Sequence, residues 1–261
     1  MLDSSARTAR VWTDRGAAYV KAMGNPKEGP HILACELVGT RAAEWLGLPT
    51  LDYGIMDLGE SDVLAYSDSE APSIGPAFVT RAIQAHTWGG DGGALVAVEN
   101  PEAIAGLVVL DTWIVNRDRY CQRGNETIRN VRNVLLTGEG ASRSRVRLIA
   151  MDHTHCFTYG QELRSAKLSR IDVVKARQVL GLFDEFRPFV SRQRIATFSR
   201  RLSTFDRATA IELTQGVPSA WGWDTDVAAD VQNLLSEHAR FLAEEIEVLL
   251  ETTCGWDPVV G

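Results

Sequence analysis

The sequence predicts an α+β fold with two lobes: a small lobe of strands and one helix over residues 1–85, and a larger, mainly helical lobe over residues 86–261. Short apolar segments separated by turns dominate the first lobe. A glycine-rich segment at 88–93 (WGGDGG) indicates a joint. Helical periodicity prevails after residue 167 and ends in a long amphipathic pattern over 226–250. We expect the two lobes to form one functional domain.

The first lobe is predicted to contain a hairpin, a helix and two further strands. Residues 9–22 (ARVWTDRGAAYVKA) indicate two short strands around a turn at 14–16. Apolar residues spaced by three and four predict an amphipathic helix over 31–46, followed by Gly47 and Pro49, which end helices. Strands are expected at 53–58 and 76–85, on either side of a polar loop at 59–75.

The second lobe is predicted to open with a buried helix. Asn100 is a favourable cap, Pro101 suits the first helical position, and Glu102 favours the first turn. The residues that follow, AIAGLVVLDTWIV, are apolar on nearly every side. Segments 131–136 and 146–151 then indicate a hairpin with a long polar loop.

Composition restricts the classes of partner. The four cysteines are scattered without a CxxC spacing, which favours a reducing compartment: Cys35, Cys121, Cys156 and Cys254. The net charge of −7 argues against direct nucleic-acid binding. The longest apolar run, 103–110, is too short to span a bilayer, and the N-terminus lacks the pattern of a secretory signal. We therefore expect a cytoplasmic protein without a membrane or nucleic-acid partner.

The chemistry is concentrated between residues 111 and 157. Asp118 follows the buried helix in DTWIVNRDRY, Asn133 precedes the apolar residues VLL, and Asp152 ends the apolar segment RLIAMD. Phosphoryl transfer uses one carboxylate to orient a hydroxyl, while an Asn and a second Asp hold Mg²⁺ on the phosphates. Oxygen ligands of this kind suit Mg²⁺.

The order of these motifs, DxWIxNxDR, NxLL and DH, resembles that of HipA-like kinases, a branch of the protein-kinase superfold that is distantly similar to phosphatidylinositol kinases. The resemblance implies a kinase-like fold in which Asp118 is the catalytic residue and Asn133 and Asp152 bind Mg²⁺. Upstream, Lys21 in YVKA resembles the lysine that contacts the phosphates of ATP. Glu36 resembles the helix glutamate that orients it.

The adenine of ATP is expected to meet the segment between the lobes, at Arg81, Ala82 and Ile83. Asp111, Asn116 and Arg119 are interpreted as structural residues or substrate contacts, with structural support favoured for Arg119, and His153 is expected to help position Asp152.

Three features depart from the family pattern. Asp118 and Asn133 are 15 residues apart, whereas the protein-kinase loop separates the pair by five, so about ten residues (YCQRGNETIR) are inserted and Asn125 and Asn130 remain alternatives for the metal-binding Asn. The first hairpin has only Gly16 where a glycine-rich loop is usual. His153 stands where Phe-Gly follows the metal-binding Asp.

The expected function is that of an ATP- and Mg²⁺-dependent phosphotransferase, with a HipA-like serine/threonine protein kinase preferred. A small-molecule or lipid kinase, a nucleotide-binding pseudokinase, and transfer of AMP in place of phosphate remain open, because a fold does not fix the acceptor. Zinc binding by His153, His155 and Cys156 is disfavoured, since no second Cys/His pair lies at ligand spacing.

Overall fold

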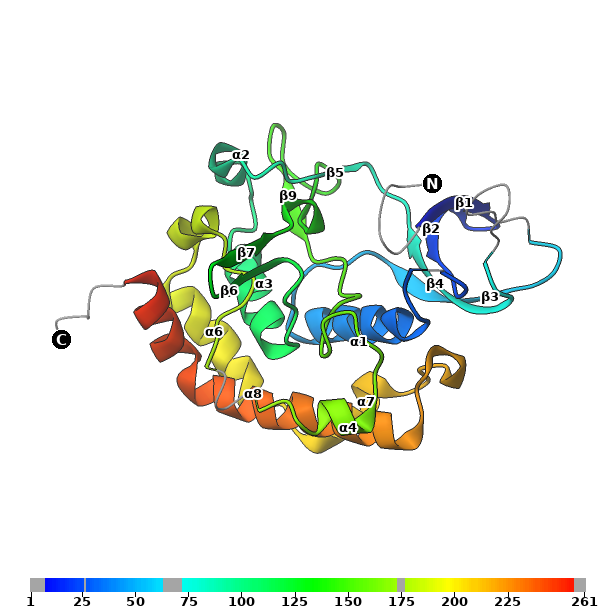
Figure 1. Cartoon of the computed structure of the whole chain (residues 1–261). Coiled ribbons are helices and arrows are strands. Elements are labelled where there is room, and N and C mark those ends of the chain that lie inside the picture. Colours follow the sequence, from blue (N-terminus) through cyan, green and yellow to red (C-terminus); the bar gives the residue numbers. More distant parts are fainter. Residues whose placement is uncertain (1–7, 26, 63–71, 173–176, 256–261) are drawn as a thin grey trace.

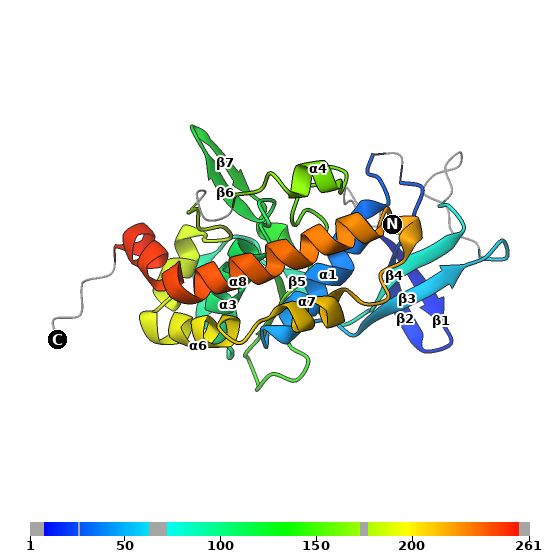
Figure 2. The same cartoon turned by 90° about the horizontal axis from the view of Figure 1, so that it is seen from below.

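The computed structural model describes residues 8–25, 27–62, 72–172 and 177–255, which form a mixed α+β structure (Figure 1). A small antiparallel sheet lies at one end of the molecule, and a mostly helical part makes up the rest. The α+β prediction is therefore confirmed. The final helix, α8 (Thr225–Cys254), runs along most of the length of the molecule (Figure 2).

The first sheet has four antiparallel strands in the order β1-β2-β4-β3. Their bounds are Ala9–Thr13 for β1, Gly16–Lys21 for β2, Tyr53–Leu58 for β3 and Gly75–Arg81 for β4. The strands predicted at 9–22 and 53–58 are confirmed, and part of the predicted loop at 59–75 lies outside the described residues. The strand predicted over 76–85 is too long, because residues 82–84 leave this sheet and Ala85 starts a strand of another.

Helix α1 (His31–Trp45) packs against this sheet and is buried on nearly all sides. The predicted helix is confirmed, but its amphipathic character is not. Besides β4, helix α1 contacts α7 (Arg207–Thr214), the 3₁₀ helix η3 (Ser219–Trp221) and α3 (Glu102–Trp113). A polar face facing solvent was expected from the sequence, whereas later parts of the chain cover it.

The second sheet has three strands in the order β5-β8-β9. They are β5 (Ala85–Thr87), β8 (Leu135–Thr137) and β9 (Arg147–Ile149), all antiparallel to their neighbours. The hairpin predicted from 131–136 and 146–151 is confirmed with shorter strands, since Val131–Asn133 forms a 3₁₀ turn, η1.

The segment between the sheets differs from the prediction. Trp88 is only 1% exposed and its ring packs against Phe183 and Phe186, with centroids 5.1 and 5.3 Å away. Asp91 accepts a hydrogen bond from Gly93 N at the start of α2 (Gly92–Val96). The segment predicted as a joint at 88–93 thus begins with a residue of the main hydrophobic core, and the chain passes from the first sheet to the second at 82–84.

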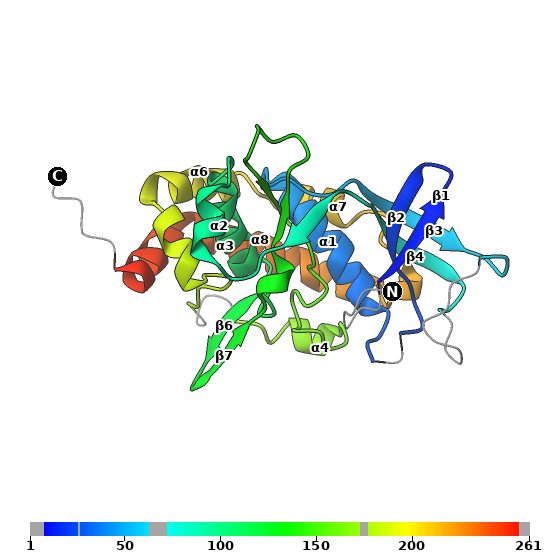
Figure 3. The ribbon, with the colours of Figure 1, turned by 90° about the horizontal axis from the view of Figure 1, so that it is seen from above.

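The insertion between Asp118 and Asn133 is a folded hairpin. Its strands, β6 (Tyr120–Arg123) and β7 (Glu126–Arg129), form a two-stranded sheet that projects from the molecule (Figure 3). A two-residue turn at Gly124 and Asn125 joins them, and Gly124 has the positive φ of 59° that a glycine accommodates. Because a hairpin returns to its starting point, it leaves the two ends of the insertion close together.

The helical part is built around α3 (Glu102–Trp113), in which every residue from Ala103 to Trp113 is buried, as predicted. Asn100, however, does not cap this helix. Its side chain bonds the backbone N–H and C=O of Leu148 and so ties the helix start to β9. The surrounding helices are α4 (Ser165–Leu168), η2 (Asp184–Phe189) and α6 (Arg192–Leu202), together with α7 and α8. Within the described residues, none of the helices is both long and apolar enough to cross a membrane.

A buried ion pair joins the end of α3 to the end of β9. Arg119 Nε donates to Asp111 Oδ2 over 2.7 Å, and both side chains are 0% exposed. Asn116 Nδ2 donates to the other Asp111 oxygen, and Arg119 Nη2 donates to the carbonyl of Met151. Arg119 is thus structural, and it fixes Asp118 relative to the strand that leads into Asp152.

We predict that Arg119→Met lowers the free energy of unfolding by about 3–5 kcal/mol, because Asp111 stays buried without its cation. Urea unfolding measures this change. The matched control is Arg192→Met, whose ion pair with Glu251 is 41% and 32% exposed and should contribute less than about 1 kcal/mol. Equal effects of the two substitutions would contradict the prediction.

Candidate active site

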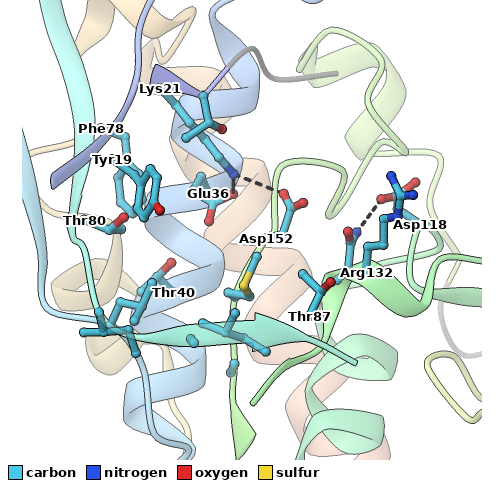
Figure 4. A pocket seen from close by; sticks show the side chains of 18 of the residues that line it. Tyr19, Lys21, Glu36, Thr40, Phe78, Thr80, Thr87, Asp118, Arg132 and Asp152 are labelled. Atoms are coloured by element: carbon cyan, nitrogen blue, oxygen red, sulfur yellow. Dashed lines mark hydrogen bonds and ion pairs between the residues drawn. The ribbon is translucent and has the colours of Figure 1, made fainter. Parts of the chain in front are cut away.

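A cleft of about 930 Å³ opens between the first sheet, α1 and the loops around β8 and β9 (Figure 4). All five residues that the sequence singled out for phosphate, metal and catalytic roles line it: Lys21, Glu36, Asp118, Asn133 and Asp152. The first sheet adds Tyr19, Phe78 and Thr80, and α1 adds Thr40. Residues separated by more than 100 positions in the chain therefore share one cavity.

Lys21 stands at the centre of an ion triad. Its Nζ lies 3.0 Å from Glu36 Oε2 and 3.1 Å from Asp152 Oδ1 (Figure 4). The three side chains are 14%, 5% and 22% exposed. The ion pair expected between Lys21 and Glu36 is present, and the same lysine also contacts Asp152. The triad connects the end of β2, the middle of α1 and the segment after β9.

The charges of the triad stabilise one another. Burial by itself lowers the pKa of Lys21, but the carboxylates of Asp152 and Glu36 outweigh burial and raise that pKa above its usual value. Burial raises the pKa of Asp152, whereas the Lys21 ammonium and a hydrogen bond from Thr154 bring it down to about 2. Burial raises the pKa of Glu36, and the Lys21 ammonium opposes that effect. At neutral pH the cleft therefore contains a charged lysine beside the charged carboxylate of Asp152.

Asp118 lies on the other side of the cleft and is held by amides. Asn133 Nδ2 donates to Asp118 Oδ2 over 2.7 Å, and Asn130 Nδ2 reaches the same oxygen at 3.3 Å. Within the described residues, Asp118 Oδ1 has no hydrogen-bond partner. Asn125, the other alternative, lies in the β6–β7 turn and does not line the cleft.

Two backbone conformations near these residues are uncommon. Asp152 has a φ of 59°, and Val115, three residues before Asp118, has a φ of 56°. A left-handed conformation is moderately tolerated by Asp and is unfavourable for a β-branched residue. Such conformations persist where the surrounding structure enforces them, commonly at functional sites. The amino-acid pattern gave no signal for either.

His153 does not position Asp152 in the expected way. Its backbone N–H donates to Glu36 Oε2 over 3.0 Å, but its buried ring has no hydrogen-bond partner within the described residues. Burial, together with the Arg119 guanidinium, lowers the pKa of His153 to about 3, so the ring is neutral. The ring packs closely on α1, where a Cβ at Gly39 would lie 2.3 Å from His153 Cβ. The neighbour that does bond Asp152 is Thr154, whose Oγ1 donates to Asp152 Oδ1 alongside Lys21 Nζ.

The segment proposed to meet adenine borders the cleft. Arg81 and Ile83 line the cavity, whereas Ala82 does not. The backbone N–H groups of Arg81 and Ala82 donate to Asp52 O and Ala17 O. Within the described chain, the N–H and C=O of Ile83 form no hydrogen bond, so these backbone groups remain available to a ligand.

The first hairpin has a short, self-contained turn. Thr13 Oγ1 donates to Gly16 O and accepts from Arg15 N, and Thr13 pairs directly with Gly16. The turn therefore has no glycine-rich cradle for phosphates. Two further residues line the cleft that the sequence did not predict to do so. Arg132 lies near Asp118 (Figure 4), and His155 is the other.

The zinc alternative gains no support. Over the described ranges, no three His, Cys, Asp or Glu side chains are grouped to hold a metal ion. Cys156 is buried and its Sγ donates to the carbonyl of Cys35, while His155 is directed to Glu28. The oxygens of Asn133 and Asp152 remain the metal ligands to consider.

Comparison with solved structures finds distant similarity, while comparison of the sequence finds none. No protein-family model matches the sequence, and no curated protein matches it. The fold is similar to HipA of Shewanella oneidensis MR-1, solved in a complex of a toxin–antitoxin system with HipB and operator DNA, with a TM-score of 0.46 and 9% identity. The match covers 92% of this chain, which spans 64% of that HipA chain.

The lowered pKa of Asp152 predicts a dependence of stability on pH. Because this pKa is about 2 in the folded protein and 3.8 ordinarily, the charged carboxylate stabilises the fold above the ordinary value. That contribution is lost as the pH falls toward the folded-state value. The difference in the free energy of unfolding between wild type and Asp152→Asn should therefore shrink from about pH 5 to about pH 2.

Urea unfolding at a series of pH values measures this difference. Asp57→Asn, which changes an exposed carboxylate on β3, serves as the control and should differ from wild type by a constant small amount. An Asp152→Asn difference that does not change with pH would show that the Lys21 ion pair is not what stabilises the carboxylate.

Proposed function

We propose that this protein is an ATP- and Mg²⁺-dependent phosphotransferase, and more narrowly a HipA-like serine/threonine protein kinase. The observation that carries the proposal is the pairing of Lys21 with both Glu36 and Asp152 in the cavity that also contains Asp118 and Asn133. One cleft thus offers a buried cation for phosphates, oxygens for a metal ion and a carboxylate for a hydroxyl.

Lys21 is the group suited to the phosphates. Its ammonium donates to two carboxylates, Glu36 and Asp152. A bound nucleotide brings several negative charges, to which the ammonium turns while Glu36, fixed by the backbone N–H of His153, keeps the lysine oriented. The adenine then borders Ile83, whose free backbone groups suit its polar edge.

The residues present fit Mg²⁺. Asn133 uses its amide nitrogen on Asp118, which leaves its oxygen available, and Asp152 uses Oδ1 on Lys21 and Thr154, which leaves Oδ2. Two protein oxygens are a typical share for Mg²⁺, whose remaining ligands are phosphate oxygens and water. When bound, the ion neutralises charge on the transferring phosphoryl group.

Asp118 is the residue suited to the acceptor. Its Oδ2 is fixed by Asn133 and Asn130, so that Oδ1 is free to accept the hydrogen bond of an incoming hydroxyl. The carboxylate orients that hydroxyl for in-line attack and takes its proton. A serine or threonine of a protein is the preferred acceptor because the sequence motifs resemble those of HipA-like kinases.

One observation favours a second candidate, a module that binds nucleotide without transferring phosphate. The self-contained turn between β1 and β2 provides no glycine-rich cover for the phosphates. A pseudokinase of this kind would bind ATP through Lys21 and act through partner proteins. Binding and turnover therefore have to be measured separately.

The test is incubation of the purified protein with Mg²⁺ and γ-labelled ATP, with and without a degenerate serine/threonine peptide mixture, followed by mass spectrometry. The wild type should gain phosphate or transfer it to peptide. Asp118→Asn and Asp152→Asn should each lower the rate by roughly 10²-fold or more, since each removes a group required in the transition state.

Asp57→Asn, an exposed carboxylate outside the cleft, is the control and should retain the wild-type rate. ATP binding is measured in parallel by calorimetry, where Lys21→Met should weaken it. Tight ATP binding by a wild type that transfers no phosphate to protein, peptide or small hydroxyl compounds would favour the pseudokinase. An adduct with the mass of AMP would identify nucleotide transfer.

A further inference from the structure

The β6–β7 hairpin lies between Asp118 and Asn133 in the chain and has no role in the proposed reaction so far. It projects from the body of the protein, and Figures 2 and 3 show it from opposite sides. Its base lies close to Asp118 in the chain, because Tyr120, which begins β6, pairs directly with Arg129, which ends β7. A segment that lies along the hairpin therefore leads toward Asp118.

Both faces of the hairpin are anchored at its base. On one face, Cys121 is 3% exposed and Ile128 packs beside it against the main hydrophobic core. On the other face, the Arg129 guanidinium lies 5.3 Å from the centre of the Phe183 ring and pairs with Glu185 over 2.8 Å. The hairpin is thus fixed to the second lobe although its tip extends into solvent.

The outer edge of β6 is covered by the segment 178–181. The backbone N–H of Gly181 donates to the carbonyl of Tyr120 over 2.9 Å. Farther along the strand, Gln178 Nε2 donates to the carbonyl of Gln122 over 2.9 Å. The carbonyls of Tyr120 and Gln122 therefore point away from β7.

The outer edge of β7 is open. In an antiparallel pair, residues that point their backbone groups outward lie opposite each other and alternate with residues that bond across the pair. Tyr120 and Gln122 pair with Arg129 and Thr127, so the N–H and C=O of both β7 residues also point outward. Among the residues that the structure describes, none of these four backbone groups has a hydrogen-bond partner.

An open strand edge of this kind fits an extended peptide. Thr127 and Arg129 are exposed, and their unpaired N–H and C=O groups form a template for one more strand. A peptide that adds to a sheet edge is held by main-chain hydrogen bonds, and its alternate side chains supply the specificity. A small molecule lacks the regularly spaced backbone groups that match two successive outward-facing residues.

The charge near the base of β7 indicates which peptides fit best. Arg132 follows the end of β7, is exposed, and lines the cleft near Asp118 (Figure 4). Its guanidinium has no hydrogen bond or ion pair within the described part of the chain, whereas Arg129 is already paired with Glu185. Because a guanidinium binds carboxylates through two parallel hydrogen bonds, an acidic side chain is the complement of Arg132.

We propose that the acceptor is an extended protein segment that adds as a third strand to the open edge of β7. Its serine or threonine then lies at Asp118 and an acidic side chain of the same segment at Arg132. The inference rests on the proposed phosphotransfer and deepens it by naming the class of acceptor. Docking itself makes and breaks no covalent bond.

Amide hydrogen exchange, followed by NMR, tests docking without turnover. The probe is a degenerate peptide mixture with a fixed central serine and glutamate fixed at each other position in turn. In the free protein the amides of Cys121 and Ile128, which bond across the hairpin, should exchange slowly and those of Thr127 and Arg129 quickly. The peptides should slow exchange at Thr127 and Arg129 severalfold. Unchanged exchange at both would overturn the proposal.

Thr127→Pro removes one outward N–H without removing a bond between β6 and β7, because proline is tolerated where the N–H of an edge strand faces solvent. In the phosphotransfer assay it should raise the KM for the peptides roughly 3- to 10-fold, the effect of a lost hydrogen bond, with kcat and the KM for ATP unchanged. Slow exchange of the Ile128 amide verifies that the hairpin is intact.

Thr127→Val is the matched control, because it keeps the backbone N–H and removes only the hydroxyl that bonds Gln122. It should behave as wild type. Equal effects of the two substitutions, or an unchanged peptide KM in Thr127→Pro, would overturn docking at this edge.

Arg132→Gln tests the charge. The preference for peptides with glutamate over peptides with glutamine at the same position should fall roughly 2- to 5-fold in kcat/KM, as expected for an exposed ion pair. Arg143→Gln, which changes an exposed arginine outside the cleft, should keep the wild-type preference. A raised KM for ATP with an unchanged preference would place Arg132 on the nucleotide and overturn its role with the acceptor.

The outcomes separate this inference from the proposed function. A wild type that transfers no phosphate to any acceptor overturns the proposed function, and hydrogen exchange alone then decides whether peptides dock on β7. A wild type that phosphorylates small hydroxyl compounds but no peptide overturns the docking proposal and leaves the phosphotransferase standing.

Discussion

The ion triad of Lys21, Glu36 and Asp152 is the interaction on which the arrangement of the site depends. Burial of any one of these charges alone would be expensive, and the three are tolerated because a single ammonium contacts both carboxylates. The triad also joins elements that are far apart in the chain: the pairs span 15 and 131 residues. The end of β2, the middle of α1 and the segment after β9 are thereby held around one point.

The opposite wall of the cleft is fixed by a separate set of contacts. The buried pair of Asp111 and Arg119 ties the end of α3 to Met151, immediately before Asp152. Asn133 and Asn130 then orient Asp118 from the far end of the β6–β7 hairpin. Both walls of the cleft are thus held by hydrogen bonds and ion pairs between residues of the protein itself.

The cleft is lined by charged and amide side chains, and the nearby turn between β1 and β2 lacks a glycine-rich loop. The turn between β1 and β2 is closed on itself by the hydrogen bonds of the Thr13 hydroxyl. Across the cleft, Asp118 accepts hydrogen bonds from two amides and lies 3.9 Å from His155, which in turn lies 3.5 Å from Glu28.

The sequence alone determined the α+β class, most strand and helix positions, and the five polar residues of the cleft, because periodicity and motif order are local properties. Tertiary structure decided the rest. It ended the strand at Arg81, buried Trp88 where a joint was predicted, and directed Asn100 to Leu148 when a helix cap was expected. It also brought Glu28 and His155 beside Asp118. Each of these features depends on residues far away in the sequence, which supply the hydrogen bonds, the opposite charges or the covering side chains. A local sequence pattern cannot predict which distant residues these are.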